Sequence, residues 1–101
     1  MKFVIENPQV NISVLFRRAG YHFVKREGEE MSFARSLTGQ KFPRFHIFSK
    51  MEGNKLIVNI HIDHKAASYE GSSAHSGEYG EDSKLLREEM EKLMSLGNKG
   101  D

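Results

Sequence analysis

The chain runs Arg44-Phe45-His46-Ile47-Phe48 and, a few residues later, Leu56-Ile57-Val58-Asn59-Ile60-His61-Ile62-Asp63-His64. Apolar and polar residues alternate in both runs, which predicts two strands that each carry one apolar face. The turn signal Glu52-Gly53-Asn54 lies between the two strands and pairs them. Burial brings the apolar faces together, and the opposite face then carries Arg44, His46, Phe48, Lys50, His61 and Asp63.

Residues before this pair predict a strand, a helix and a further hairpin. Residues 2–6 form a short apolar strand, and Asn7-Pro8 is typical of a helix start. The helix then carries an apolar stripe and ends at Gly20, a position suited to a C-cap glycine. Alternation over residues 10–16 also fits a strand, but the two punctuated ends favour the helix. Residues 21–26 and 29–37 predict two strands joined by Glu27-Gly28-Glu29.

The C-terminal part predicts a loop followed by a helix. Residues 66–80 show no strand or helix period and are rich in Gly and Ser, and a loop of this length is usually functional or disordered. A helix from about Asp82 to Leu96 follows, with the apolar stripe Leu86, Met90, Leu93 and Met94, and it ends at Gly97. The order β-α-β-β-β-β-α predicts an α+β two-layer sandwich, a mainly antiparallel sheet with two helices on one face. We expect a single domain over residues 1–97 and a disordered tail over 98–101.

Composition limits the class of protein. The chain has 101 residues, 38% hydrophobic and 29% charged, which is typical of one soluble globular domain. It has no cysteine, so disulfides and thiolate metal sites are excluded. No apolar run has the length of a membrane span and the N-terminus does not resemble a signal peptide, so we expect a cytoplasmic protein. The net charge of +1 provides no strong attraction to nucleic acid, although basic residues concentrate before residue 65.

The polar face of the strand pair predicts a metal site. His61 and Asp63 point to the same side of one strand, and His46 lies on that side of the neighbouring strand. Two imidazoles and a carboxylate form a recurrent open site for zinc, with manganese or iron as alternatives. The loop can add His75 or Glu78, and His64 is a possible substitute ligand. A metal with an open position activates water, so the primary hypothesis is a metal-dependent hydrolase of a phosphodiester, with Glu78 or Asp63 as general base.

Two further hypotheses need no metal. In the first, the histidines act with Lys65, Tyr69 and Arg44 as acid–base groups on a phosphodiester, or bind a small-molecule or nucleic-acid phosphate. Basic residues interleaved with aromatics also favour RNA binding, for which Arg17, Arg18, Arg44 and Lys50 are the candidates. The second hypothesis is an interaction protein that forms a homodimer through a sheet edge. The alternative to all of these hypotheses is that the polar face of the sheet is solvated and has no specific role.

Two resemblances accompany these patterns. The segment from Leu15 to Gly28 resembles the helix-to-strand opening of the HicA-type toxin ribonucleases, which implies a related α+β fold and ribonuclease activity. Those proteins carry a catalytic histidine soon after the turn glycine, whereas Glu29-Glu30-Met31-Ser32 follows here. The pattern His61-x-Asp63, Tyr69-x-Gly71 and His75-x-x-Glu78-Tyr79 is similar to a group of small bacterial proteins with no assigned activity, which implies a shared fold.

Overall fold

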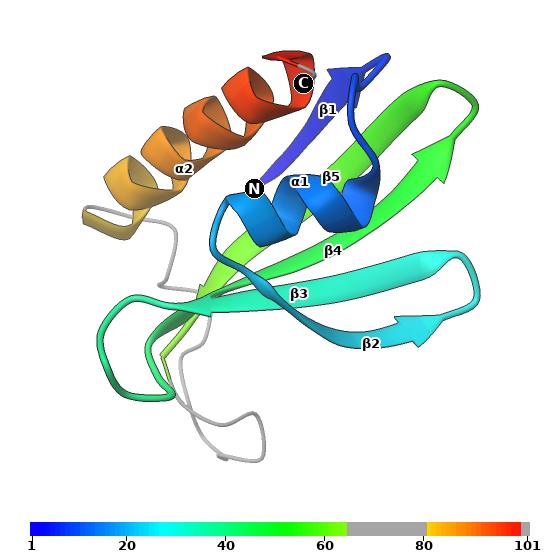
Figure 1. Cartoon of the computed structure of the whole chain (residues 1–101). Coiled ribbons are helices and arrows are strands. Elements are labelled where there is room, and N and C mark those ends of the chain that lie inside the picture. Colours follow the sequence, from blue (N-terminus) through cyan, green and yellow to red (C-terminus); the bar gives the residue numbers. More distant parts are fainter. Residues whose placement is uncertain (65–80, 100–101) are drawn as a thin grey trace.

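A computed structural model describes residues 1–64 and 81–99 of the chain, and these contain one antiparallel sheet and two helices. The elements are β1 (Lys2–Glu6), α1 (Ile12–Arg18), β2 (His22–Glu27), β3 (Glu30–Ser36), β4 (Arg44–Glu52), β5 (Lys55–Asp63) and α2 (Glu81–Lys99). The strands follow the spatial order β1-β5-β4-β3-β2 (Figure 1). The predicted α+β class and order of elements are confirmed.

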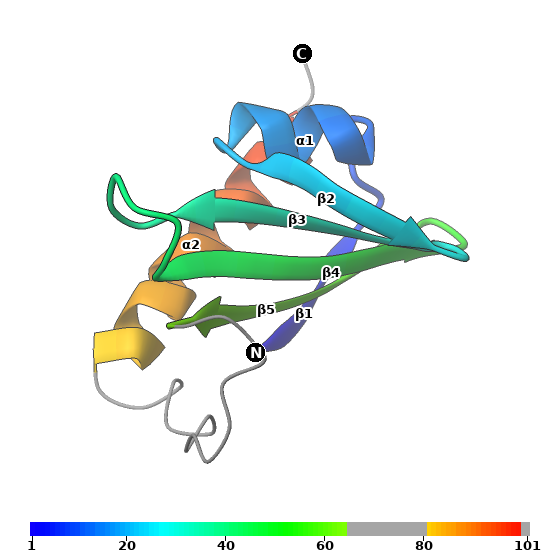
Figure 2. The same ribbon diagram turned by 90° about the horizontal axis from the view of Figure 1, so that it is seen from below.

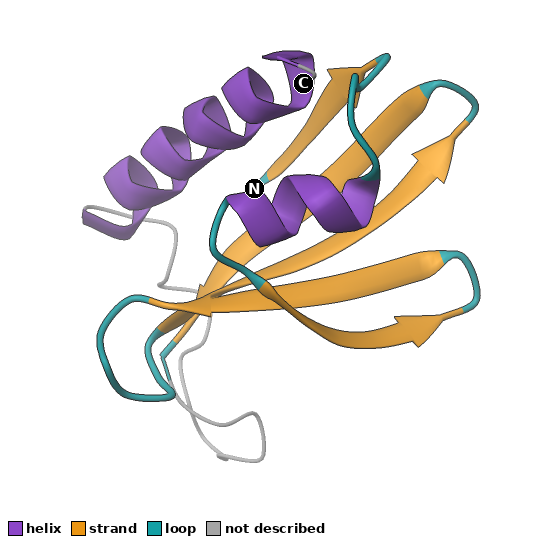
Figure 3. Ribbon diagram, in the orientation of Figure 1, coloured by secondary structure: helices purple, strands orange, loops and turns teal. Residues whose placement is uncertain are grey.

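Within residues 1–64 and 81–99, the sheet has one face covered by helices and one face without them. Both helices lie on the same side of the strands, as Figures 1 and 2 show. The tight turns at Gly28 and Gly53 lie at one end of the sheet, and the longer β3–β4 loop lies at the other (Figure 3). Both turn glycines have a positive φ, of 63° and 64°, which glycine adopts without steric cost. We call the side of the sheet away from the helices the open face.

The helix α1 is confirmed over the competing strand, but its predicted start at Asn7-Pro8 is wrong. The N-cap is Asn11, whose side-chain oxygen accepts a hydrogen bond of 2.8 Å from the Ser13 amide. Asn7 instead has a φ of 53°, and its amide donates to the Asn54 carbonyl over 2.7 Å. Both asparagines suit a cap, and tertiary hydrogen bonding decides between them. The predicted end at Gly20 is confirmed, with a φ of 97° there.

The helix α2 confirms the predicted stripe and corrects its end. Leu86 and Leu93 are fully buried, and Met90 and Met94 pack against the core. The helix continues through Gly97 to Lys99, so Gly97 does not end it and the tail predicted from residue 98 is wrong for residues 98 and 99. A Cβ atom on Gly97 would lie 3.0 Å from the Ile5 side chain, so the absent side chain permits close packing of α2 on β1. Neither described helix is long and apolar enough to cross a membrane.

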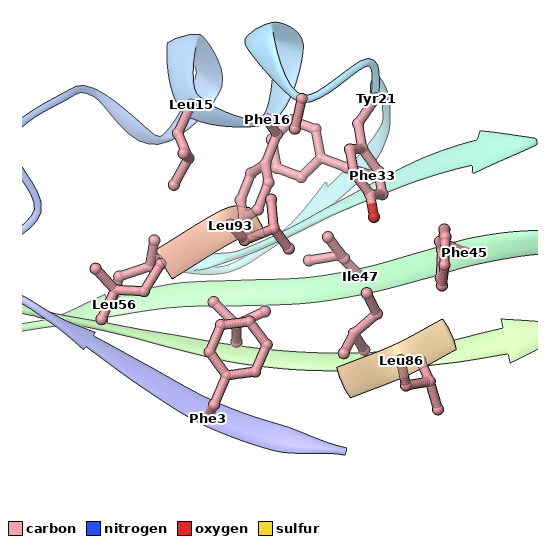
Figure 4. Packing of buried hydrophobic residues seen from close by; sticks show 14 of the residues in the cluster. Phe3, Leu15, Phe16, Tyr21, Phe33, Phe45, Ile47, Leu56, Leu86 and Leu93 are labelled. Carbon is pink, nitrogen blue, oxygen red and sulfur yellow. The ribbon is translucent and has the colours of Figure 1, made fainter. Parts of the chain in front are cut away.

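The hydrophobic core lies between the sheet and the helices (Figure 4). Phe16 of α1 packs on Phe33 of β3 with ring centroids 4.7 Å apart, and Leu86 and Leu93 of α2 pack against the same side. Burying each such side chain contributes about 1.5–3 kcal/mol. Because the core takes the whole apolar face of β4 and β5, the polar residues of these strands are left on the open face.

A group of polar side chains lies at the edge of this core. Glu89 of α2 is only 5% exposed, and it accepts hydrogen bonds from the Tyr21 hydroxyl (2.7 Å) and the Arg35 guanidinium (2.8 Å). Lys92 lies 3.4 Å from the same carboxylate and also donates to the Ala19 carbonyl. Burial, and then the adjacent Glu89 carboxylate, hold the pKa of Tyr21 well above its ordinary value. We call Tyr21, Arg35, Glu89 and Lys92 the buried network.

Candidate metal centre

The register of β4 and β5 places the predicted residues side by side. The turn at Gly53-Asn54 pairs Glu52 with Lys55, and each step along the hairpin then fixes the next pair. His46 therefore lies directly opposite His61, and Arg44 lies opposite Asp63. The expected proximity of His46, His61 and Asp63 on the open face is confirmed.

The Asp63 carboxylate joins the two imidazoles. Its Oδ2 atom lies 3.0 Å from His46 Nδ1, and its Oδ1 atom lies 3.0 Å from His61 Nε2. The three residues offer ligand atoms that all lie within 4.8 Å of one another. A tetrahedral zinc with bonds of about 2.0–2.2 Å holds its ligand atoms roughly 3.3 Å apart, which is close to the two contacts of 3.0 Å and shorter than the limit of 4.8 Å. The group could therefore hold a metal ion once the imidazoles move closer together.

The three residues of this group are partly buried and remain accessible from solvent. The side chains of His46, Asp63 and His61 are 14%, 23% and 35% exposed. His46 is thus the innermost of the three residues and His61 the outermost. A ligand entering the centre would approach from the His61 side, because that imidazole is the most accessible of the three.

Asp63 is held in its ionised form. Burial alone opposes its charge, but hydrogen bonds from His46 and His61 outweigh burial and hold the pKa of the Asp63 carboxyl well below its ordinary range. An ionised carboxylate only accepts hydrogen bonds, so His46 Nδ1 and His61 Nε2 both carry protons in this arrangement. A carboxylate with so low a proton affinity suits a ligand or an orienting group better than the general base predicted as an alternative role.

Metal binding would exchange these two hydrogen bonds for two metal–nitrogen bonds. Each neutral imidazole would shift the proton that it now directs at Asp63 to its other ring nitrogen, which frees the lone pair that binds the metal. His46 Nε2 is buried, and in the described part of the chain it has no hydrogen-bond partner. Metal-binding imidazoles are usually held through the second nitrogen, so the orientation of His46 comes from Asp63 and from ring packing instead.

Arg44 is a member of this centre that the metal hypothesis did not include. Its Nε atom donates to Asp63 Oδ2 over 3.3 Å, and its guanidinium lies 4.9 Å from the centroid of the Phe42 ring. With neutral imidazoles, one anion and one cation give the centre no net charge. A bound divalent metal would raise that charge to +2, which favours an anionic fourth ligand such as hydroxide or a phosphate oxygen.

The other predicted catalytic and metal residues are not brought into this centre. His64 Nε2 lies 2.6 Å from Asp82 Oδ2, so the substitute ligand pairs with α2 instead of joining His46 and His61. Lys65, Tyr69, His75 and Glu78 lie outside the described residues. His22 is exposed on β2, where Ala34 separates it from His46 across the sheet.

The basic residues predicted to bind RNA fall on two sides of the molecule. Arg44 and Lys50 lie on the open face of β4, whereas Arg17 and Arg18 lie at the end of α1 on the helix side. Arg35, a further basic residue of the sheet, belongs to the buried network. The four candidates therefore do not form one surface, and only the pair on β4 adjoins the metal centre.

Phe48, one of the aromatic residues interleaved with basic residues in the predicted RNA-binding pattern, extends the centre along β4. Its ring centroid lies 4.5 Å from that of His46 and 5.7 Å from that of His61. The alternation of residues along β4 already placed Phe48 on the same face of the sheet as His46. No family model, curated protein or solved structure matches this chain. The chemistry of the centre must therefore carry the functional interpretation.

Proposed function

We propose that the protein binds a divalent metal, zinc in the first place, through His46, His61 and Asp63. One observation carries the proposal, namely that two imidazole nitrogens and a carboxylate converge within 4.8 Å on the open face. Nitrogen and carboxylate ligands in this number are typical of catalytic zinc sites, which retain a position for water or substrate. Manganese and iron accept the same ligands and are the alternatives.

The proposed activity is hydrolysis of a phosphodiester. A metal bound with an open position supplies a nucleophile at neutral pH by lowering the pKa of its bound water. In this protein, Asp63 orients both imidazoles before a metal binds and would then be the third ligand, and Arg44 would attract an anionic phosphate to their side. The surplus positive charge of the loaded centre supports a phosphate over a neutral substrate.

Metal analysis of protein prepared without a histidine tag tests the binding. We expect one equivalent of zinc after dialysis against a zinc-buffered solution, and loss of that equivalent in the His61→Gln variant. His22→Gln is the matched control, because His22 lies on the same face but outside the centre. Zinc should also raise the melting temperature of the wild type, since a ligand at 100 times its Kd stabilises the folded state by about 2.7 kcal/mol.

The hydrolytic activity needs a separate measurement. Bis(p-nitrophenyl) phosphate should be cleaved by the zinc-loaded wild type and by His22→Gln, but not by His61→Gln. Zinc binding that is equal in the wild type and in His61→Gln would refute the site. Stoichiometric zinc without cleavage of any phosphodiester would support the metal-binding function and refute the hydrolase activity.

A further inference from the structure

Phe48 is an aromatic residue without a place in the hydrophobic core. It lies on the open face of β4, between Ser32 of β3 and Asn59 of β5. It belongs neither to the buried cluster nor to the partly buried residues that pack against that cluster, and its ring is partly exposed. Core stability therefore does not account for an apolar ring at this position.

The Phe48 ring packs against both imidazoles of the metal centre. Its plane is inclined by only 27° to the His61 ring, and the two centroids are 5.7 Å apart. Phe48 lies two residues from His46 on the same strand, which corresponds to roughly 7 Å along the sheet. A planar group stacked on Phe48 would therefore lie beside the candidate metal ligands.

Basic side chains surround this ring. Lys50 is the next residue of β4 on the open face, Lys25 of β2 is the register partner of Ser32, and Lys2 of β1 is the partner of Asn59. Ser32 is small and buried, and Lys25, Glu27, Glu30 and Phe48 lie around it. Ion pairs join Lys25 to Glu27 and Lys50 to Glu52, but such exposed pairs are weak and exchange readily.

Arg44 adds a phosphate-binding group on the other side of the imidazoles. Its Nε atom is engaged by Asp63, and its terminal Nη groups make no hydrogen bond within the described residues. Stacking against Phe42 restricts the guanidinium plane. An arginine with a fixed plane and free terminal donors is well suited to bind a phosphate.

We propose that the open face binds single-stranded nucleic acid, with a base stacked on Phe48 and backbone phosphates at Arg44, Lys50 and Lys25. The inference rests on the proposed function, because the metal centre would then act on the phosphodiester of the bound strand. A single strand is the form that fits, since its unpaired bases expose the planar faces that stack on aromatic side chains. Paired bases in a duplex cannot reach a ring on a flat sheet.

Fluorescence anisotropy with a labelled ten-nucleotide strand tests this binding. We expect both oligo-U and oligo-dT to bind, with affinity that falls as salt rises from about 50 to 200 mM. Phe48→Ala should weaken binding about 5- to 150-fold, the range for loss of one stacked base, and Phe48→Tyr should retain it. Phe23→Ala is the matched control, since Phe23 is the most exposed phenylalanine of the described residues and lies on β2, away from the metal centre. A matched duplex should bind more weakly than either strand, and a preference for oligo-U would identify RNA.

The results separate this inference from the metal hypothesis. The strand could bind in a way that depends on Phe48 while the protein takes up no zinc when zinc is supplied. This result would support the nucleic-acid face and refute the metal centre. Zinc binding without any salt-dependent binding of a strand would support the metal centre and refute the nucleic-acid face. Equal losses in Phe48→Ala and Phe23→Ala, or a Phe48→Tyr variant as weak as Phe48→Ala, would overturn the stacking role.

Discussion

The two sides of the sheet each contain a carboxylate surrounded by donors, and they differ in what those donors can do. On the helix side, Glu89 accepts hydrogen bonds from Tyr21 and Arg35. On the open face, Asp63 contacts His46, His61 and Arg44. The first carboxylate is almost completely buried, whereas the second remains partly accessible.

The difference shows why only one of these groups can be a metal centre. Arginine and lysine offer no lone pair to a metal at neutral pH, and the raised pKa of Tyr21 keeps its hydroxyl protonated, so the buried network neutralises and fixes the Glu89 carboxylate. Imidazole can either donate a proton or coordinate a metal, so the group around Asp63 can be rearranged by a ligand. The two carboxylates therefore have a comparable number of charge-assisted contacts with different uses. The contacts of Glu89 stabilise the fold, whereas those of Asp63 can be replaced by a ligand.

Removing Glu89 should produce the largest effect on stability. The Glu89→Ala variant leaves the Arg35 charge partly buried without its partner, and breaking a buried ion pair costs about 3–5 kcal/mol. Urea unfolding would measure this loss. Glu88→Ala is the matched control, because Glu88 is the adjacent exposed residue of α2 and should change stability by less than about 0.5 kcal/mol. Equal effects of the two substitutions would contradict the central role of the buried network.

The Asp63 group should show its contribution through pH. Because the folded protein lowers the pKa of Asp63, the unfolded chain takes up the proton first as the solution is acidified. The stability that Asp63 contributes is therefore present above about pH 4, the ordinary value for Asp, and is lost at lower pH. Its size is on the order of 1–3 kcal/mol, as for hydrogen bonds to a charged group.

Unfolding midpoints of the wild type and Asp63→Asn between pH 7 and pH 3 would check this dependence. The wild type should be the more stable protein at pH 7, and the difference should shrink toward pH 3. A difference that stays constant over this range would mean that Asp63 does not titrate abnormally.

Much of the open face was predictable from local patterns in the sequence. Strand alternation assigned His46, His61 and Asp63 to one face, and the two-residue turn at Gly53-Asn54 determines their register. The same register pairs Arg44 with Asp63, so this ion pair was also within reach of the sequence. Short-range geometry suffices here because the whole group lies on one hairpin.

The buried network was not predictable in the same way. Helical spacing does place Glu89 on the stripe of Leu86 and Leu93, so its burial had a local signal. Its partners Tyr21 and Arg35 come from distant parts of the chain and meet Glu89 only through the packing of α2 on the sheet. The start of α1 was ambiguous for a similar reason, since long-range hydrogen bonding selected Asn11 over Asn7 as the cap.

Substitution of Arg44 should give the smallest change in free energy of the variants considered. It also distinguishes most clearly the group around Asp63 from the buried network around Glu89. If Arg44 serves to attract an anion, its charge opposes a metal at the neighbouring ligands, and Arg44→Met should tighten zinc binding about fivefold, on the order of 1 kcal/mol. The same variant should bind the oligonucleotide more weakly, because one phosphate contact is lost. Zinc titration by calorimetry and anisotropy would measure the two changes, with Lys50→Met as the control that weakens the strand without affecting zinc. Weaker zinc binding in Arg44→Met would instead mean that Arg44 fixes Asp63 as Arg35 fixes Glu89, and that the two carboxylates differ only in exposure.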